Sequence, residues 1–248
     1  MKRSFIILFI FLLIYFIGCK KSPTEVYPIE DNYMSLHVGD IRQFYLAKAT
    51  DTSYALWKIT GKAFRSDGQE VFISEWYINS LDSNSMYTYE FIRDGFYYGT
   101  SMDSTSDYPG NSYLEERLAP IDPFDGETFI QTIGVNNIDS SQNYNTVKYL
   151  GEYDTPAGKF KNVYNIIGNR GVFNSLQVKT YYAKNWGYLG IAYINSFNNL
   201  DLMAVVNYMK IDGKEIGKFV DMSKLTSKKY YLTSKIIIHL SPFGVFIN

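Results

Sequence analysis

Segments of alternating apolar and polar residues, joined by Asp-Gly pairs, restrict the fold of this chain more than any other feature. Three such pairs each separate two alternating segments: Asp67-Gly68, Asp94-Gly95 and Asp212-Gly213. Alternation is typical of half-buried β-strands. Asp and Gly accept the positive φ angles that a two-residue primed turn requires. The pattern therefore predicts successive antiparallel β-hairpins.

The second half of the chain continues this pattern. Further strands are expected at 129–135, 146–153, 160–168, 176–182 and 189–194. No segment shows the apolar period of a helix, and 17% aromatic residues favour sheets. About ten to twelve strands are too many for one flat sheet. The predicted fold is mainly β, an antiparallel meander forming a half-barrel, a barrel or a sandwich, with little helix apart from the signal peptide.

Two polar stretches are predicted to connect strands. Residues 100–128 are rich in Ser, Asp, Pro and Gly, so we expect a long loop there. This loop is a candidate lid or rim of a binding site; the simpler interpretation is a surface excursion with a short helical turn at 114–118. Residues 136–145 are predicted to be a polar connector.

The N-terminus has the features of an export signal. Lys2 and Arg3 precede an apolar run over residues 5–17, which is followed by Gly18-Cys19. At 1.5 Å per residue this run covers about 20 Å, too little for a bilayer core of ~30 Å. Residues 16–19, Phe-Ile-Gly-Cys, resemble the lipobox of bacterial lipoproteins. This resemblance implies that Cys19 is acylated and becomes the new N-terminus. An uncleaved anchor and a plain secretory signal are the alternatives.

The predicted organisation has four parts. Residues 1–18 form the signal peptide, 19–34 the lipidated tether, 35–220 the antiparallel β domain, and 221–248 a C-terminal extension. Removing the signal leaves 22 basic and 25 acidic side chains, a balance that does not attract nucleic acid. With Cys19 as the only cysteine, no disulfide is expected.

A local signature lies within the predicted β domain. Residues 155–160 read Thr-Pro-Ala-Gly-Lys-Phe, and residues 181–187 read Tyr-Tyr-Ala-Lys-Asn-Trp-Gly. The two motifs resemble those of a family of uncharacterised bacterial envelope lipoproteins, and related domains resemble the open half-barrels of the LolA and LolB lipoprotein carriers. The resemblance implies no catalytic residues. The motif residues are expected to determine the fold: Pro156, Gly158, Phe160, Tyr181, Tyr182 and Gly187.

Residues with catalytic or metal-binding chemistry are few. His37 and His239 stand far apart in the sequence, so neither a histidine-rich zinc site nor a serine triad is expected. Glu115 and Glu116 should point to opposite faces of a strand. We therefore predict no catalytic residue and no cofactor. The weak candidates for a Ca²⁺ site are Asp122, Asp125 and Glu127, for which a solvated turn is the simpler interpretation, as it is for Asp103 and Asp107.

Aromatic residues are the remaining candidates for binding. They could stack on sugars or line an apolar pocket, although alternating aromatics are more often core residues. The candidates are Trp57, Trp76, Trp186, Tyr97 and Tyr98.

The sequence thus predicts a non-catalytic envelope lipoprotein, held at the outer membrane by Cys19, that binds an apolar or polymeric ligand. One alternative is a structural or protein-interaction module without a small ligand, and another is an enzyme that acts on glycans. An apolar cavity inside the barrel would favour the first function, whereas a filled interior would favour the second.

Overall fold

The computed structural model describes residues 33–34, 36–47, 53–78, 86–102, 115–135, 139–169, 177–194 and 200–225. The predicted signal peptide, with Cys19, and most of the C-terminal extension, with His239, lie outside these ranges. Within the described ranges no helix is long and apolar enough to cross a membrane.

The described residues form one antiparallel sheet of 13 strands and a single short 3₁₀ turn, Met222–Lys224. The strands are β1 (Ile41–Ala47), β2 (Ser53–Phe64), β3 (Glu70–Ile78), β4 (Met86–Arg93), β5 (Phe96–Thr100), β6 (Glu115–Pro120), β7 (Thr128–Val135), β8 (Asp139–Thr155), β9 (Gly158–Asn169), β10 (Gln177–Ala183), β11 (Gly187–Ile194), β12 (Leu200–Ile211) and β13 (Lys214–Gly217). This confirms the prediction of a mainly β meander.

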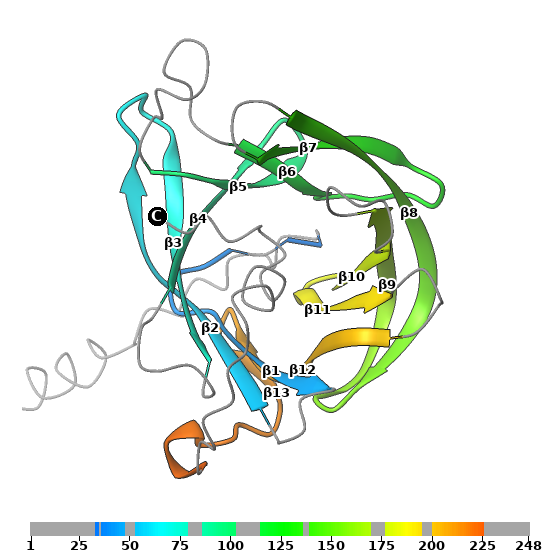
Figure 1. The fold of residues 1–248 in the computed structure, drawn as a ribbon. Coiled ribbons are helices and arrows are strands. Elements are labelled where there is room, and N and C mark those ends of the chain that lie inside the picture. Colours follow the sequence, from blue (N-terminus) through cyan, green and yellow to red (C-terminus); the bar gives the residue numbers. More distant parts are fainter. Residues whose placement is uncertain are drawn as a thin grey trace, which may run out of the picture. The chain divides into compact units, whose positions relative to one another are not determined.

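The strand order shows two meanders joined side by side. It runs β6-β5-β4-β3-β2-β1-β12-β11-β10-β9-β8-β7, and β13 pairs with β12 outside this path. The pairing of β1 with β12 joins the halves through a ladder that extends from Ile41↔Lys210 to Ala47↔Met203. Figure 1 shows that the sheet curls into a nearly closed barrel, in which β6 and β7 approach each other.

Tight turns gather at one end of this barrel. Strand register places six described connections there: 65–69, 94–95, 121–127, 156–157, 184–186 and 212–213. We call this the turn end. The alternate connections lie at the opposite end, and most of their residues are outside the described ranges.

The Asp-Gly turns explain part of this arrangement. Asp94-Gly95 and Asp212-Gly213 have positive φ at both residues, as a primed two-residue turn requires. At Asp67-Gly68 the predicted hairpin is present, but only Gly68 has positive φ, and Arg65 N–H donates to the Gln69 carbonyl at 3.0 Å. The primed turn expected there was therefore wrong, because the loop is longer than two residues.

Two expectations about connections were also wrong. Residues 115–120 form strand β6 instead of a loop with a helical turn, because Leu118 and Ala119 are buried in the core and the segment pairs with β5. Residues 139–145 belong to strand β8 instead of a polar connector. Asn143 and Asn145 of this segment are buried, so polar composition did not indicate exposure here.

The main core fills the interior of the barrel, and the first described residues of the chain belong to it. Tyr33, Met34 and Leu36 are buried there. In Figure 1 this start of the described chain, drawn in blue, lies inside the ring of strands. The backbone N–H of Tyr33 donates to the carbonyl of Ile121 at 2.9 Å, which fixes the start of the segment at the turn end.

Candidate functional site

A row of three large side chains crosses the interior on adjacent strands. Arg42 of β1 pairs with Trp57 of β2, which in turn pairs with Trp76 of β3. The guanidinium carbon of Arg42 lies 4.2 Å from the centre of the Trp57 ring, and Nη2 donates to the Trp186 carbonyl at 3.0 Å. Arg42 is only 1% exposed. A cation is thus held against an aromatic face away from water.

A buried carboxylate, Glu90 of β4, lies in the same interior. It is 0% exposed. The Tyr97 hydroxyl donates to Oε2 at 2.7 Å, and the Thr88 hydroxyl donates to Oε1 at 3.1 Å. Trp76 Nε1 donates in turn to the Thr88 oxygen at 3.2 Å. Donors from β4 and β5 therefore bind the carboxyl group, and Trp76 of β3 is linked to it through Thr88.

Burial shifts the pKa of both charged groups toward their neutral forms. Desolvation raises the pKa of Glu90 above its ordinary value, against the opposing effect of hydrogen bonds from Tyr97 and Thr88 and of the Arg42 charge. Desolvation likewise lowers the pKa of Arg42, while Asp40 and Glu90 act in the opposite direction. The interior therefore contains a partly compensated pair of charges, an arrangement more typical of structure than of proton transfer.

Glu90 should make the stability of the domain dependent on pH. Because its folded-state pKa is raised, its contribution is most favourable below about pH 4.5, the ordinary value, and is lost as the pH rises through the folded-state pKa. Glu90→Gln should therefore gain stability relative to the parent as the pH is raised from acid to neutral. Urea unfolding of both proteins across this range measures the difference, and a difference that does not change with pH would contradict the assignment.

The space beside Arg42 is small. A cavity of about 10 Å³ is lined by Met34, Leu36, Arg42, Trp57, Trp76, Tyr97 and Tyr188. This volume accommodates about one water molecule. Within the described residues, Nε and Nη1 of Arg42 and Nε1 of Trp57 have no hydrogen-bond partner. The aromatic side chains thus fill this part of the interior and leave no room for an acyl chain.

The interior is also polar where the barrel closes. Among the described strands, β6 and β7 are not joined by a backbone ladder. A side-chain bond bridges them instead: Gln131 Nε2 of β7 donates to Glu116 Oε1 of β6. Asn145 Nδ2 of β8 donates to Gln131 Oε1 at 3.1 Å and so extends this bridge. All three side chains are buried. We call this boundary, with its bridge of Glu116, Gln131 and Asn145, the seam.

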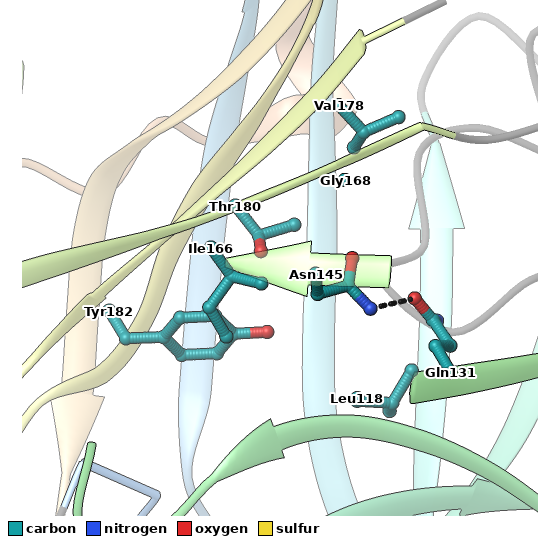
Figure 2. Close-up of a pocket in the computed structure, with 8 residues that line it drawn as sticks. All are labelled: Leu118, Gln131, Asn145, Ile166, Gly168, Val178, Thr180 and Tyr182. Carbon is teal, nitrogen blue, oxygen red and sulfur yellow. Dashed lines mark hydrogen bonds between the residues drawn. The ribbon is translucent and has the colours of Figure 1, made fainter. Parts of the chain in front are cut away.

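A second cavity of about 10 Å³ adjoins the seam (Figure 2). Its lining mixes amide, hydroxyl and apolar groups from five strands: Leu118, Gln131, Asn145, Ile166, Gly168, Val178, Thr180 and Tyr182. A Cβ atom at Gly168 would come within 1.9 Å of Asn145 Oδ1, so the bridge depends on glycine at this position. The cavity has room for about one water and not for a sugar ring.

The residues of the first motif lie at the turn between β8 and β9. Pro156 occupies the turn and Gly158 has φ +143°. Phe160 and Val163, both buried, enter the main core. Ala157 N–H donates to the carbonyl of Val206 at 3.2 Å, which attaches the turn to β12.

The residues of the second motif end strand β10 and begin β11. The Tyr182 side chain is buried and lines the seam cavity, whereas Tyr181 stacks on Tyr153 with ring centres 4.5 Å apart. Gly187 has φ +75°, and a Cβ atom there would lie 2.6 Å from Arg42 Nη2. The second motif therefore borders the Arg42 cluster.

The carboxylates considered for calcium act within turns. Asp125 Oδ1 accepts from Tyr149 N–H at 2.7 Å, and Glu127 Oε2 accepts from Phe124 N–H at 3.3 Å. Among the described residues, no group of three or more His, Cys, Asp or Glu side chains is placed to hold a metal ion. Asp122 lies in the same turn.

The other polar candidates are dispersed. Glu115 and Glu116 point to opposite faces of β6, as predicted: Glu115 pairs with Arg65 Nη2 at 2.8 Å on the outer face, whereas Glu116 belongs to the seam. His37 N–H donates to Asp40 Oδ2 at 3.0 Å at the turn end. Asp103 and Asp107 lie outside the described residues.

Four of the five aromatic candidates are core residues, which confirms the simpler interpretation and not the alternative of sugar stacking. Trp57, Trp76, Tyr97 and Tyr98 are buried. Trp186 is partly buried, and its ring packs edge-on against Phe160 with centres 5.7 Å apart.

The buried charges of Arg42 and Glu90 were not among the residues predicted from the sequence. Arg42 lies in phase with the inward-facing Phe44 and Leu46 of β1, and Glu90 lies in phase with Thr88 of β4. This period-2 phase was the available signal, since a charged residue at an apolar position of a strand indicates a buried, paired group.

Comparisons with known proteins find similarity in structure and none in sequence families. No family model matches the chain, and no curated protein matches it. Two solved structures cover 73% of this chain and 99% of their own: a proposed lipoprotein of Parabacteroides distasonis, with 14% identity and a TM-score of 0.40, and a proposed exported protein of Bacteroides fragilis with a YmcC-like fold, with 15% identity and a TM-score of 0.43.

Proposed function

We propose that this protein is a non-catalytic, lipid-anchored domain of a bacterial cell envelope that binds a polymeric or protein partner through its outer surface. The observation that carries this proposal is the filling of the interior by side chains of the described residues. Aromatic rings, the charged groups of Arg42 and Glu90, and the chain's own Tyr33, Met34 and Leu36 occupy space that a small apolar ligand would need. Of the functions considered from the sequence, the interaction module is therefore favoured over the carrier.

The chemistry of the buried groups also supports a non-catalytic role. Glu90 accepts hydrogen bonds from Tyr97 and Thr88, and Glu116 accepts one from Gln131, so both carboxyl groups are used within the protein. General acid–base catalysis requires such groups within hydrogen-bonding reach of a substrate. Because Glu90 and Glu116 are buried, a large substrate cannot reach their carboxyl groups.

The lipid anchor rests on Gly18-Cys19 at the end of the apolar signal. Several acyl chains on one cysteine, each burying methylenes at ~0.8 kcal/mol apiece, would hold the domain at a bilayer without further contacts. Cys19→Ser should therefore move the protein from the membrane fraction to the soluble envelope fraction. Immunoblotting of fractionated cells measures this shift, with Ser22→Ala as the control that should stay on the membrane.

Purification of the native protein from membranes tests the kind of partner. Mass spectrometry should find a co-purifying protein or glycan polymer and no stoichiometric lipid inside the domain. Binding of an apolar fluorescent probe such as 1,8-anilinonaphthalene sulfonate to the folded Cys19→Ser protein would revive the carrier function. Persistence of Cys19→Ser on the membrane would contradict the lipid anchor.

A further inference from the structure

Exposed apolar side chains gather at the turn end of the barrel. Phe124, in the connection between β6 and β7, is 63% exposed, and Tyr149 and Leu150 of β8 are 45% and 36% exposed. Tyr149 N–H is bonded to Asp125, the neighbour of Phe124, so the β6–β7 connection lies beside this part of β8. We call Phe124, Tyr149 and Leu150 the apolar rim.

An irregularity in β8 produces this exposure. The register between β8 and β9 shifts between Tyr149↔Tyr164 and Gly151↔Val163, which leaves Leu150 as an extra residue. A bulge of this kind re-aims side chains, since two residues of one strand oppose one of the other. Two consecutive residues, Tyr149 and Leu150, are consequently exposed where a regular strand would turn one of them inward.

The described chain begins beside the same surface. The Tyr33 ring meets Tyr164 edge-on with centres 5.1 Å apart, and Tyr164 packs on Tyr149 with centres 4.9 Å apart. Tyr33 also donates its backbone N–H to Ile121, at the start of the connection that carries Phe124. The segment that leads back to Cys19 therefore leaves the domain next to the apolar rim.

Taken with the lipid anchor of the proposed function, on which it rests, this geometry leads us to propose that the apolar rim docks on the lipid bilayer. Phe124, Tyr149 and Leu150 enter the interface between lipid headgroups and acyl chains, where aromatic side chains with a polar edge are favoured. The turn end then faces the membrane, and the opposite end faces away from it.

Chain length favours this orientation. Cys19 and Tyr33 are separated by 14 residue steps, which span at most about 50 Å when fully extended. A strand of 12 residues such as β9 is about 40 Å long. In the inverted orientation the tether would have to run the length of the barrel, which is close to the tether's full extended length. The proposed orientation needs only a small part of that length. Exposed side chains elsewhere, such as Tyr87 and Tyr144, lack this connection to the anchor.

Site-specific fluorescence tests the orientation. Cys19 is the only cysteine and its thiol is blocked once acylated, so a cysteine introduced by Phe124→Cys can be labelled alone. The matched control is Tyr87→Cys, which also replaces an exposed aromatic residue but lies near the opposite end of the barrel. The lipidated proteins are labelled with an environment-sensitive dye and reconstituted in vesicles of phosphatidylethanolamine and phosphatidylglycerol that contain doxyl-labelled lipid.

The expected result is quenching of the label at position 124 by about twofold or more, with little quenching at position 87, as for a side chain that reaches the acyl boundary. Equal quenching at both positions, or none at 124 while the protein co-sediments with the vesicles, would overturn the docking and leave the anchor intact. Failure of the lipidated protein to co-sediment would instead count against the anchor.

A second measurement changes the apolar rim itself. In the lipidated protein with the label at position 124, quenching by the same vesicles should be reduced severalfold by Leu150→Ser but not by Tyr144→Ser. Absence of any vesicle-dependent change at 124, in a protein whose circular dichroism matches that of the parent, would overturn the proposal. Quenching that is abolished by Tyr144→Ser would place the contact on another face and would overturn it as well.

Discussion

Replacing Gly217 by alanine should lower the free energy of unfolding by more than about 4 kcal/mol, or prevent folding altogether. Gly217 ends β13 with φ +86°. A Cβ atom there would lie 2.2 Å from the Asn207 carbonyl oxygen and 2.9 Å from Cα and Cβ of Ala157. These neighbours are mostly backbone atoms of β12 and of the β8–β9 turn, so the clash cannot be relieved by rotating a side chain.

Gly68 provides a matched control for this substitution. Its φ of +87° is nearly that of Gly217, yet a Cβ atom there would meet no atom within 4 Å. Gly68→Ala should therefore cost only the ~1–2 kcal/mol of a left-handed conformation. Thermal and urea unfolding of both variants separate the steric contribution from the conformational one. Equal losses in the two variants would show that the close approach at Gly217 does not determine stability.

Replacing Arg42 by methionine should destabilise the domain by about 3 to 5 kcal/mol, because the substitution removes a cation from a buried set of charges. Methionine retains much of the contact with Trp57 but loses the hydrogen bond to the Trp186 carbonyl. Glu90 would then be buried without the attraction of Arg42, which favours its ionised form. Arg42→Lys should cost less, because it keeps the charge while losing the planar stacking.

A double-mutant cycle isolates the interaction between the two charges. Adding Glu90→Gln to Arg42→Met should restore part of the lost stability, with a coupling of about 0.5–3 kcal/mol. Urea unfolding at neutral pH provides the four free energies. Additive losses would show that Arg42 acts mainly through Trp57 and Trp186, and that its charge is not coupled to Glu90.

Local features of the fold could be predicted from the sequence. Alternation gave the strands, and Asp94-Gly95 and Asp212-Gly213 gave two primed turns, because each depends on residues adjacent in the chain. Strand β6 was missed because its two glutamates and its proline resemble a loop. Its burial comes from β5 and from the seam, which are contacts that a local pattern does not contain.

The long-range features could not be predicted in this way. The ladder between β1 and β12 joins residues such as Ile41 and Lys210, and no local signal marks them as partners. The filled interior likewise depends on Tyr33 and Met34, which precede the predicted β domain and enter the core by tertiary contact. The sequence therefore does not show whether the barrel holds a ligand, whereas the packing of Tyr33 and Met34 in the core favours an interaction module over a carrier.

The seam is the line along which the barrel should open most easily. Opening there breaks the side-chain bond between Gln131 and Glu116, whereas opening anywhere else along the strand path breaks a backbone ladder. Fluctuations should therefore separate the two six-stranded walls at β6 and β7 while the β1–β12 ladder acts as their hinge. Amide hydrogens on the seam-facing edges of β6 and β7 should then exchange with solvent before those of β1 and β12.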